Sequence, residues 1–370
     1  MDFTPTEAAT DLAALTSDIV GRISPAERVA ELEAARAAID ERLWAELAAA
    51  GLLGLAAPES VDGAGLTTLE TVAVATELGR GLSRVPYGPH AITGVPIVAE
   101  HASDALAARL LRTLVDGSAV MTAAVEEDGG YHVLAPRTRL SGSTLTGTKV
   151  NVPYAGAAGV LLVSADVGDG SALVAVPADR DGIGIVETAV TGLTPVYTVE
   201  FDGVVVDEAE VLGGGSGTVA QAVDLLRLAV AADQAGTVDA ALTATAEYAR
   251  EREQFSRPIG SFQAVAQRLA DGYIDVQALQ LSVTQAAWLL SGLADADPGE
   301  PTAAIDTAKF WAAEAGHRVA HTAVHVHGGV GLDTSHTAHR YFLRAKQNEF
   351  TLGSAPVVLD ELGDLLTANP

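Results

Sequence analysis

The order in which hydrophobic periodicities follow one another along the chain constrains its fold more than any other feature. From about Pro25 to Val115, apolar residues recur every three or four positions, which is typical of amphipathic helices. From about Ser118 to Leu212, short runs rich in Val, Leu and Thr are broken by Gly, Asp and Pro, which is typical of strands and hairpins. From about Thr218 the helical period returns in long segments. We therefore predict a β-module between two helical parts.

Local signals place some of the predicted helices. Gly51 is a candidate C-cap of one helix, and Thr67 or Thr68 is a candidate N-cap of the next. A later segment, "FQAVAQRLADGYIDVQAL", has the spacing of a long amphipathic helix. Its apolar residues fall on one stripe: Phe262, Val265, Leu269, Tyr273 and Val276.

Composition excludes several classes of function. The chain has no cysteine, which excludes disulfides, thiolate metal sites and a cysteine nucleophile, and is consistent with a reducing cytoplasm. Its 22 Lys and Arg stand against 48 Asp and Glu, a formal charge of −26, which disfavours binding to nucleic acid or to an anionic membrane. The sequence shows neither a signal peptide nor a long apolar span. We expect a cytoplasmic protein.

Five segments, in order and spacing, resemble the acyl-CoA dehydrogenase family over nearly the full chain. They are "GLLGLAAPESVDGAGL", "TELGRGLSRVPYG", "LTGTKVNVPYAGAAGVLLVSA", "AEYAREREQFSRPIGSFQAVAQRLAD" and "VHVHGGVGLDTSHTAHRYFLRAK". The fourth is the strongest match. In the first, Asp62 replaces one of the family's paired glycines.

The resemblance implies an α+β multidomain fold that binds FAD and usually forms a tetramer. Its parts are an N-terminal all-α domain over residues 1–117, a middle β-barrel or β-sandwich domain over 118–215, and a C-terminal four-helix-bundle domain over 216–370. The implied substrate is an acyl-CoA thioester, and the implied electron acceptor is an electron-transfer flavoprotein or a similar protein.

The segment "REREQFSRPI" is the first candidate for a cofactor contact. Arg250, Arg252 and Arg257 concentrate positive charge in an acidic chain, and guanidinium groups suit a pyrophosphate. In similar proteins the arginine at Arg252 holds the FAD pyrophosphate of the neighbouring subunit, with the phenylalanine at Phe255 beside it. The other interpretation is a solvated helix face with Glu–Arg pairs.

A glycine turn is the second candidate. Gly328 and Gly329 allow close approach of the backbone to a dinucleotide, and His325 stands where the family has a glutamine that contacts the adenosine half of FAD. The alternative is a turn between helices. His321, His325 and His327 lack a recognisable zinc-site spacing, so we expect no metal.

The flavin-ring half of the site departs from the family pattern. Relatives carry Thr-Glu-Pro-x-x-Gly-Ser-Asp there, whereas this chain reads "MTAAVEEDGGYHVLAP", with Glu126 at the place of the glutamate. Asn151-Val152-Pro153 stands where many relatives place Trp-Ile-Thr against the flavin.

The catalytic base is missing from both usual positions. Removal of a carbon-bound proton needs a positioned base, normally a carboxylate. Alignment of "RAKQNEFTLGS" puts Leu352 at the glutamate of the largest branch, and Leu226 stands at the position used by isovaleryl-CoA dehydrogenases. Nearby acids are Glu349 and Asp224, each of which is also consistent with a surface carboxylate.

The resemblance thus predicts a catalytically incomplete subunit of an FAD-dependent acyl-CoA dehydrogenase. Some actinobacterial steroid side-chain dehydrogenases are α2β2 assemblies of dissimilar family members, in which one partner supplies the base. Two alternatives stay open: a complete homotetrameric enzyme with a relocated base, and a flavin-free scaffold or ligand-binding subunit.

Overall fold

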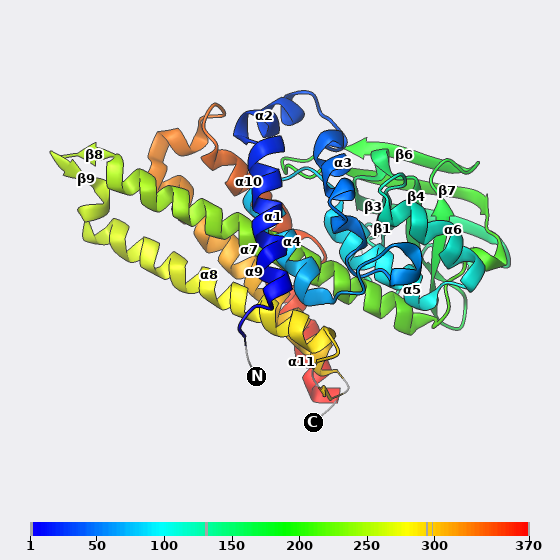
Figure 1. The fold of residues 1–370 in the computed structure, drawn as a ribbon. Helices are drawn as coiled ribbons and strands as arrows, with labels where there is room; N and C mark the ends of the chain where they lie inside the picture. The colour runs from blue at the N-terminus through cyan, green and yellow to red at the C-terminus, as the bar shows by residue number, and fades with distance from the viewer. Residues whose placement is uncertain (1–2, 130–131, 294, 298, 369–370) are drawn as a thin grey trace.

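The N-terminal part of the chain is helical. The computed structural model describes residues 3–129, 132–293, 295–297 and 299–368 (Figure 1). Thr67 caps a helix through a capping box with Glu70, and Gly51 has φ 73° just after another helix, so both predicted caps are confirmed. The helices are α1 (Glu7–Ile23), α2 (Ala26–Ala34), α3 (Glu41–Ala49), α4 (Thr68–Arg80), α5 (Val95–His101) and α6 (Asp104–Val115).

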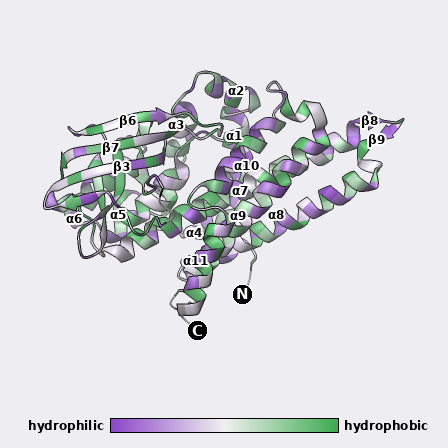
Figure 2. Cartoon of the chain, turned by 180° about the vertical axis from the view of Figure 1, so that it is seen from behind, coloured by the Kyte–Doolittle hydropathy of each residue, from purple (hydrophilic) through white to green (hydrophobic). Residues whose placement is uncertain are grey.

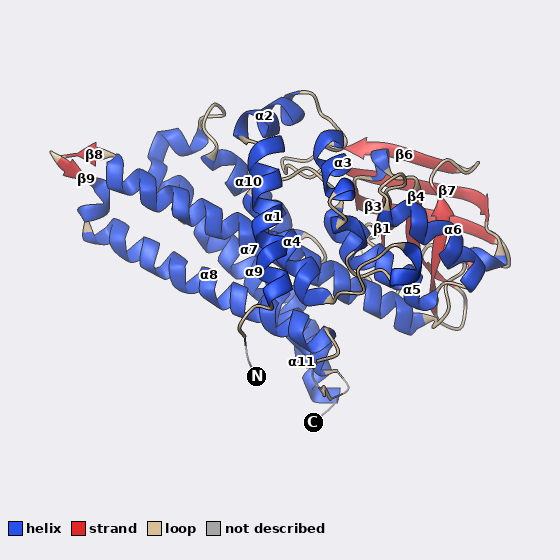
Figure 3. Ribbon diagram, viewed as in Figure 1, coloured by secondary structure: helices blue, strands red, loops and turns tan. Residues whose placement is uncertain are grey.

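The middle part is one seven-stranded sheet at one end of the molecule (Figure 3). The strands follow the order β1-β4-β2-β3-β7-β6, and β5 pairs with β4 in antiparallel register from Val160↔Pro177 to Asp166↔Ser171. A register shift between Lys149 and Val152 interrupts the β3–β7 ladder. The strands are β1 (Met121–Ala124), β2 (Arg139–Ser141), β3 (Thr144–Pro153), β4 (Val160–Asp166), β5 (Ser171–Pro177), β6 (Ile183–Thr188) and β7 (Val196–Val205).

The C-terminal part is a helical bundle in which α9 packs against α7, α8, α10 and α11. The elements are α7 (Ser216–Glu251), the hairpin β8 (Glu253–Gln254) and β9 (Arg257–Pro258), α8 (Gln263–Leu290), α9 (Glu300–His327), the 3-10 turn η7 (Gly328–Leu332), α10 (Ala338–Phe350) and α11 (Ala355–Ala368). The predicted order of helical, β and helical parts is confirmed. Among the described residues, no helix is long and apolar enough to cross a membrane.

The predicted apolar stripe of α8 is only partly buried. Val276 is buried, but Tyr273 is 60% exposed in the single chain, and Ile274 beside it is 63% exposed. A hydrophobic period identifies the face of a helix that is protected from water, whether its neighbour belongs to the same chain or to another.

The core joins the helical parts to the sheet. Gly79 of α4 and Gly236 of α7 let the two backbones approach, since an added Cβ would overlap the Asp233 and Thr76 carbonyl oxygens respectively. The π-helical segment η3 (Gly88–Gly94) packs between α7 and β1. Its buried His90 accepts a hydrogen bond at Nδ1 from the Met121 amide.

Candidate functional site

A cleft of about 520 Å³ lies where the sheet meets the helices. Leu226 of α7 and Leu352, just after α10, both line it, as do Glu126, just past the end of β1, and Asn151 of β3. One cleft thus contains both usual base positions, Leu226 and Leu352. It also contains the two residues that stand at flavin-ring positions in the family, Glu126 and Asn151. Both leucines are buried, at 6% exposure each, and a leucine side chain accepts no proton.

The turn that carries Leu352 is fixed by buried polar groups. Leu352 has φ 58°, a conformation that is strained for a leucine. Its amide donates to Glu126 Oε1 at 2.8 Å, and its carbonyl accepts from Arg227 Nε at 3.2 Å. Lys309 Nζ donates to the Gly353 carbonyl at 2.7 Å. These contacts hold the left-handed backbone in place.

Glu126 enters the cleft because of the strand that precedes it. Side chains alternate past the end of β1: Glu126 faces the cleft, and Glu127 accepts from buried Lys149 at 2.7 Å. The bulge in β3 gives Asn151 a φ of 52°, and Asn151 Nδ2 donates to Glu126 Oε2 at 2.8 Å. Burial raises the pKa of Glu126, although the hydrogen bonds from Asn151 and Leu352 oppose the shift.

Buried charges surround the Leu352 turn. Arg227 donates to Asp306 at 2.7 Å and also pairs with Glu361. Burial lowers the pKa of Lys309 to about 7, with a smaller contribution from Arg227 in the same direction. Sequence reasoning did not identify Lys309, Asp306 or Glu361 as parts of this site, because they are distant in sequence and match no motif.

The two acids considered as replacement bases do not line the cleft. Asp224 accepts from Thr302 Oγ1 at 2.8 Å, and Glu349 accepts from Lys346 Nζ at 2.5 Å. Each carboxylate therefore has its own partner away from Leu226 and Leu352. The geometry gives no support to either acid as the base.

The other predicted site residues lie at the far end of the bundle, where the hairpin β8–β9 extends outward (Figure 1). Arg252 is the C-cap residue of α7 and forms no ion pair within the described ranges. Phe255 is 88% exposed. Figure 2 shows the hydrophilic colour of this hairpin. The arrangement leaves a guanidinium and an aromatic ring free to contact another molecule.

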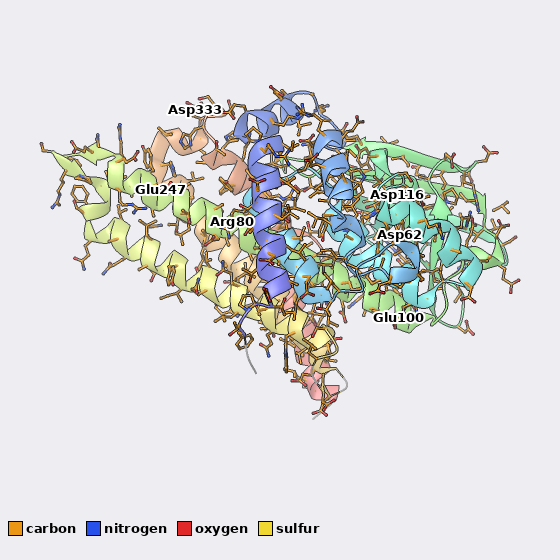
Figure 4. The ribbon with its side chains drawn as sticks, in the orientation of Figure 1. Asp62, Arg80, Glu100, Asp116, Glu247 and Asp333 are labelled. Carbon is orange, nitrogen blue, oxygen red and sulfur yellow. The ribbon has the colours of Figure 1, made fainter. Side chains whose placement is uncertain are left out.

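The glycine turn lies at the same end. Tyr248 of α7 stacks on His327 of α9 with ring centroids 4.3 Å apart, which brings the end of α7 to the start of η7. Figure 4 shows Glu247 and Asp333, which flank these elements, at this end of the bundle. Gly328 has φ 62°.

The predicted contact residues of this turn face open space. His325 is exposed, and an added Cβ at Gly328 or Gly329 would meet no atom within 4 Å. No group of three or more His, Cys, Asp or Glu among the described residues could hold a metal ion.

The two half-sites are far apart within one chain. Leu226 and Arg252 belong to one continuous helix and its cap, and a rise of about 1.5 Å per residue separates them by about 39 Å. One extended dinucleotide does not span that distance. A flavin held at Arg252 therefore has its ring outside the cleft of the same chain.

The residues fit FAD unequally at the two ends. The bundle end offers Arg250 and Arg252, which form no ion pair with any described residue, and an open glycine backbone, both of which suit a pyrophosphate. The cleft instead presents the carboxylate of Glu126, already bound by Asn151 and the Leu352 amide. The ring end thus departs from the family's donor set. Gly130 and Tyr131 of that segment lie outside the described residues.

Family models identify the class. The N-terminal domain of acyl-CoA dehydrogenase matches residues 9–118, and the C-terminal domain matches residues 213–366. The chain therefore belongs to the acyl-CoA dehydrogenases, oxidoreductases that act on CH–CH bonds and whose cofactor is FAD. The predicted family, fold class and cofactor are confirmed.

Individual relatives within this family are similar to the chain over its full length or nearly so. The chain is 45% identical to acyl-CoA dehydrogenase FadE27 of Mycobacterium tuberculosis over the full length of both proteins. It is similar to the structure of the ChsE4-ChsE5 complex from Mycobacterium tuberculosis, with 44% identity, a TM-score of 0.94 and full coverage of both chains. The Tcur3481-Tcur3483 steroid ACAD G363A variant matches with 38% identity, a TM-score of 0.91 and 99% coverage of each chain.

Proposed function

We propose that this chain is the subunit of a heteromeric acyl-CoA dehydrogenase that lacks its own catalytic base. The observation that carries the proposal is that Leu226 and Leu352 line one cleft, so both positions where relatives place the carboxylate are apolar in the same site. Neither Asp224 nor Glu349 lines that cleft. The α-proton of an acyl-CoA needs a base, and we assign that base to a related partner subunit.

The shared site follows from the separation of the half-sites. Arg252, Phe255, His325, Gly328 and Gly329 would hold the pyrophosphate and adenosine side of an FAD whose ring lies in the partner. FAD accepts the hydride when bound, and the partner supplies the acyl-CoA pocket and the carboxylate. Electrons would then pass to an electron-transfer flavoprotein or a similar acceptor. An α2β2 assembly with two such interfaces agrees with this division.

The substrate class comes from the relatives. One similar structure is the ChsE4-ChsE5 complex, and another is described as a steroid ACAD. We therefore propose a steroid or cholesterol side-chain thioester as the substrate of the assembly, in β-oxidation.

The first test is the flavin content of this chain alone and of the chain co-expressed with a related acyl-CoA dehydrogenase chain that has a carboxylate at either base position. We expect little flavin alone and about one FAD per two chains in the complex. Arg252→Ala is expected to lower the flavin content of the complex severalfold, because a pyrophosphate loses its charged donor. Arg42→Ala, at another exposed arginine, is the control.

A complete enzyme with a relocated base predicts a different result. The chain alone would then carry one FAD per chain and become reduced by an acyl-CoA. A flavin-free scaffold would leave the flavin content of the complex unchanged in Arg252→Ala. Either result would contradict the shared site.

A further inference from the structure

The cleft presents a hydrogen-bond acceptor where the family reaction needs a donor. Loss of the α-proton builds negative charge on the thioester oxygen, which a nearby backbone N–H can stabilise. The backbone N–H at the position of the missing base is that of Leu352. This N–H already donates to Glu126 Oε1 at 2.8 Å. A thioester carbonyl that entered this cleft would meet an occupied donor and a carboxylate.

Glu126 can still accept hydrogen bonds. A carboxylate has about four lone-pair sites, and the structure uses one on each oxygen, for the Leu352 amide and for Asn151 Nδ2. The side chain is partly accessible and lines the cleft. Hydrogen bonds to a charged acceptor in a largely apolar surrounding are the stronger ones. A ligand that brings a hydroxyl group would therefore gain a contact that an ether or a thioester lacks.

Most of the accessible wall of the cleft is apolar, and two charged residues that also line it, Arg344 and Asp233, pair with each other at 2.6 Å. Leu226, Ala229, Val125, Leu78 and Leu352 face the cleft, and its volume of about 520 Å³ lies within the range of small-molecule sites.

We propose that this cleft binds an apolar alcohol, with the ligand hydroxyl donating to Glu126, rather than an acyl thioester. In this chain the former reaction pocket would thus be a separate ligand site. The inference rests on the proposed function, because the cleft must be free of a flavin ring.

The test uses two isomers of one formula, octan-1-ol and 1-methoxyheptane, titrated into the full chain by calorimetry. They have equal numbers of heavy atoms, and only the alcohol donates a hydrogen bond. We expect octan-1-ol to bind at least tenfold more tightly. Glu126→Gln keeps the shape of the side chain but removes its charge, and is expected to reduce this ratio to about threefold or less. Glu247→Gln, at an exposed acid of α7, is expected to keep the full ratio.

Three binding results would overturn the proposal. They are equal affinity of the wild-type chain for the two isomers, an unchanged ratio in Glu126→Gln, and tighter binding of the thioester S-ethyl hexanethioate than of octan-1-ol. If Glu126 were instead a base, flavin reduction by substrate would be lost in the Glu126→Gln complex, which also contradicts this role.

The flavin content of the same preparation separates the two proposals. One FAD per chain in the isolated protein would contradict the proposed shared site, and the cleft would then be occupied by a flavin ring. A flavin-free chain that does not prefer the alcohol would contradict this inference but would not contradict the proposed function.

Discussion

At the scale of single residues, Arg227 connects the cleft to the bundle. It is 4% exposed, and it binds Asp306, Glu361 and the Leu352 carbonyl. Burial raises the pKa of Asp306 to about 6 even with Arg227 beside it, so this carboxylate depends on its partner. A buried ion pair adds little net stability when intact, but removal of one member leaves an uncompensated charge.

Arg227→Met is therefore expected to lower the free energy of unfolding by about 3–5 kcal/mol. Arg22→Met removes an exposed pair with Glu46 and is expected to cost no more than about 1 kcal/mol. Urea denaturation of both variants measures the difference. Equal losses would show that Arg227 is not coupled to its buried partners.

The sequence indicated both leucine positions but not what surrounds them. A sequence motif specifies which side chain stands at each position. The absence of a carboxylate at Leu226 and Leu352 could therefore be predicted. The hydrogen bond from the Leu352 amide to Glu126 could not be predicted, because every residue except proline has the same backbone donor. Lys309 was missed for a related reason: its contacts are carbonyls near the end of α10, which leave no trace in composition.

At the scale of elements, the crossing of α4 and α7 depends on small residues. An added Cβ at Gly236 would overlap the backbone of Thr76, which cannot move independently of α4. Gly236→Ala is expected to lower stability by about 1–3 kcal/mol, despite the better helix propensity of alanine. Gly217 of the same helix faces open space, so Gly217→Ala is expected to be neutral or stabilising by up to about 1 kcal/mol. Thermal unfolding of the two variants compares them, and similar midpoints would refute the close crossing.

His90 makes the contact of η3 with β1 sensitive to acid. Burial lowers its pKa to about 4, and the ring bonds the Leu114 carbonyl and the Met121 amide as a neutral imidazole. The folded-state pKa is depressed below the usual value near 6.5, so protonation favours the unfolded state as pH falls from about 6.5 to 4. We expect this residue to account for a loss of about 3 kcal/mol across that window.

Urea midpoints at pH 7 and pH 5 measure this acid sensitivity. His90→Gln carries no titrating group and is expected to show a smaller difference between the two midpoints. An equal difference in wild type and variant would assign the acid sensitivity to other groups.

Element types were more predictable than their contacts. Thr67 and Gly51 could be identified because caps are local, and the sheet because its runs are short and β-branched. The bulge at Asn151 was not predicted, since it depends on pairing with β7. The domain limits at 117/118 and 215/216 stay a prediction.

At the scale of the whole molecule, one face of α8 is exposed and has no neighbour among the residues that the structure describes. Ile274 and Leu281 are seven residues apart on one stripe and are 63% and 52% exposed. Ile274→Glu together with Leu281→Glu is expected to dissociate the proposed heteromer into smaller species with little loss of subunit stability. Arg268→Glu changes the charge by the same amount at an exposed site about 120° around the helix from Ile274, and is the control. Sedimentation velocity of the co-expressed complex measures the outcome, and an unchanged species would place the interface elsewhere.

The fold of the whole molecule could be predicted because the motifs occur in the family's order over the full chain. The distance between the two half-sites could not be predicted, because neither motif shows whether the segment between them is one straight helix. It follows from α7 as one uninterrupted helix of 36 residues.

That uninterrupted helix limits how the gene can change. Each inserted or deleted residue between Leu226 and Arg252 would shift one end by about 1.5 Å and rotate it by about 100° relative to the other. Substitutions on the solvent side of α7 leave both ends where they are. Over evolutionary time the solvent-side residues of this segment are therefore free to drift, whereas its buried positions and its length are not.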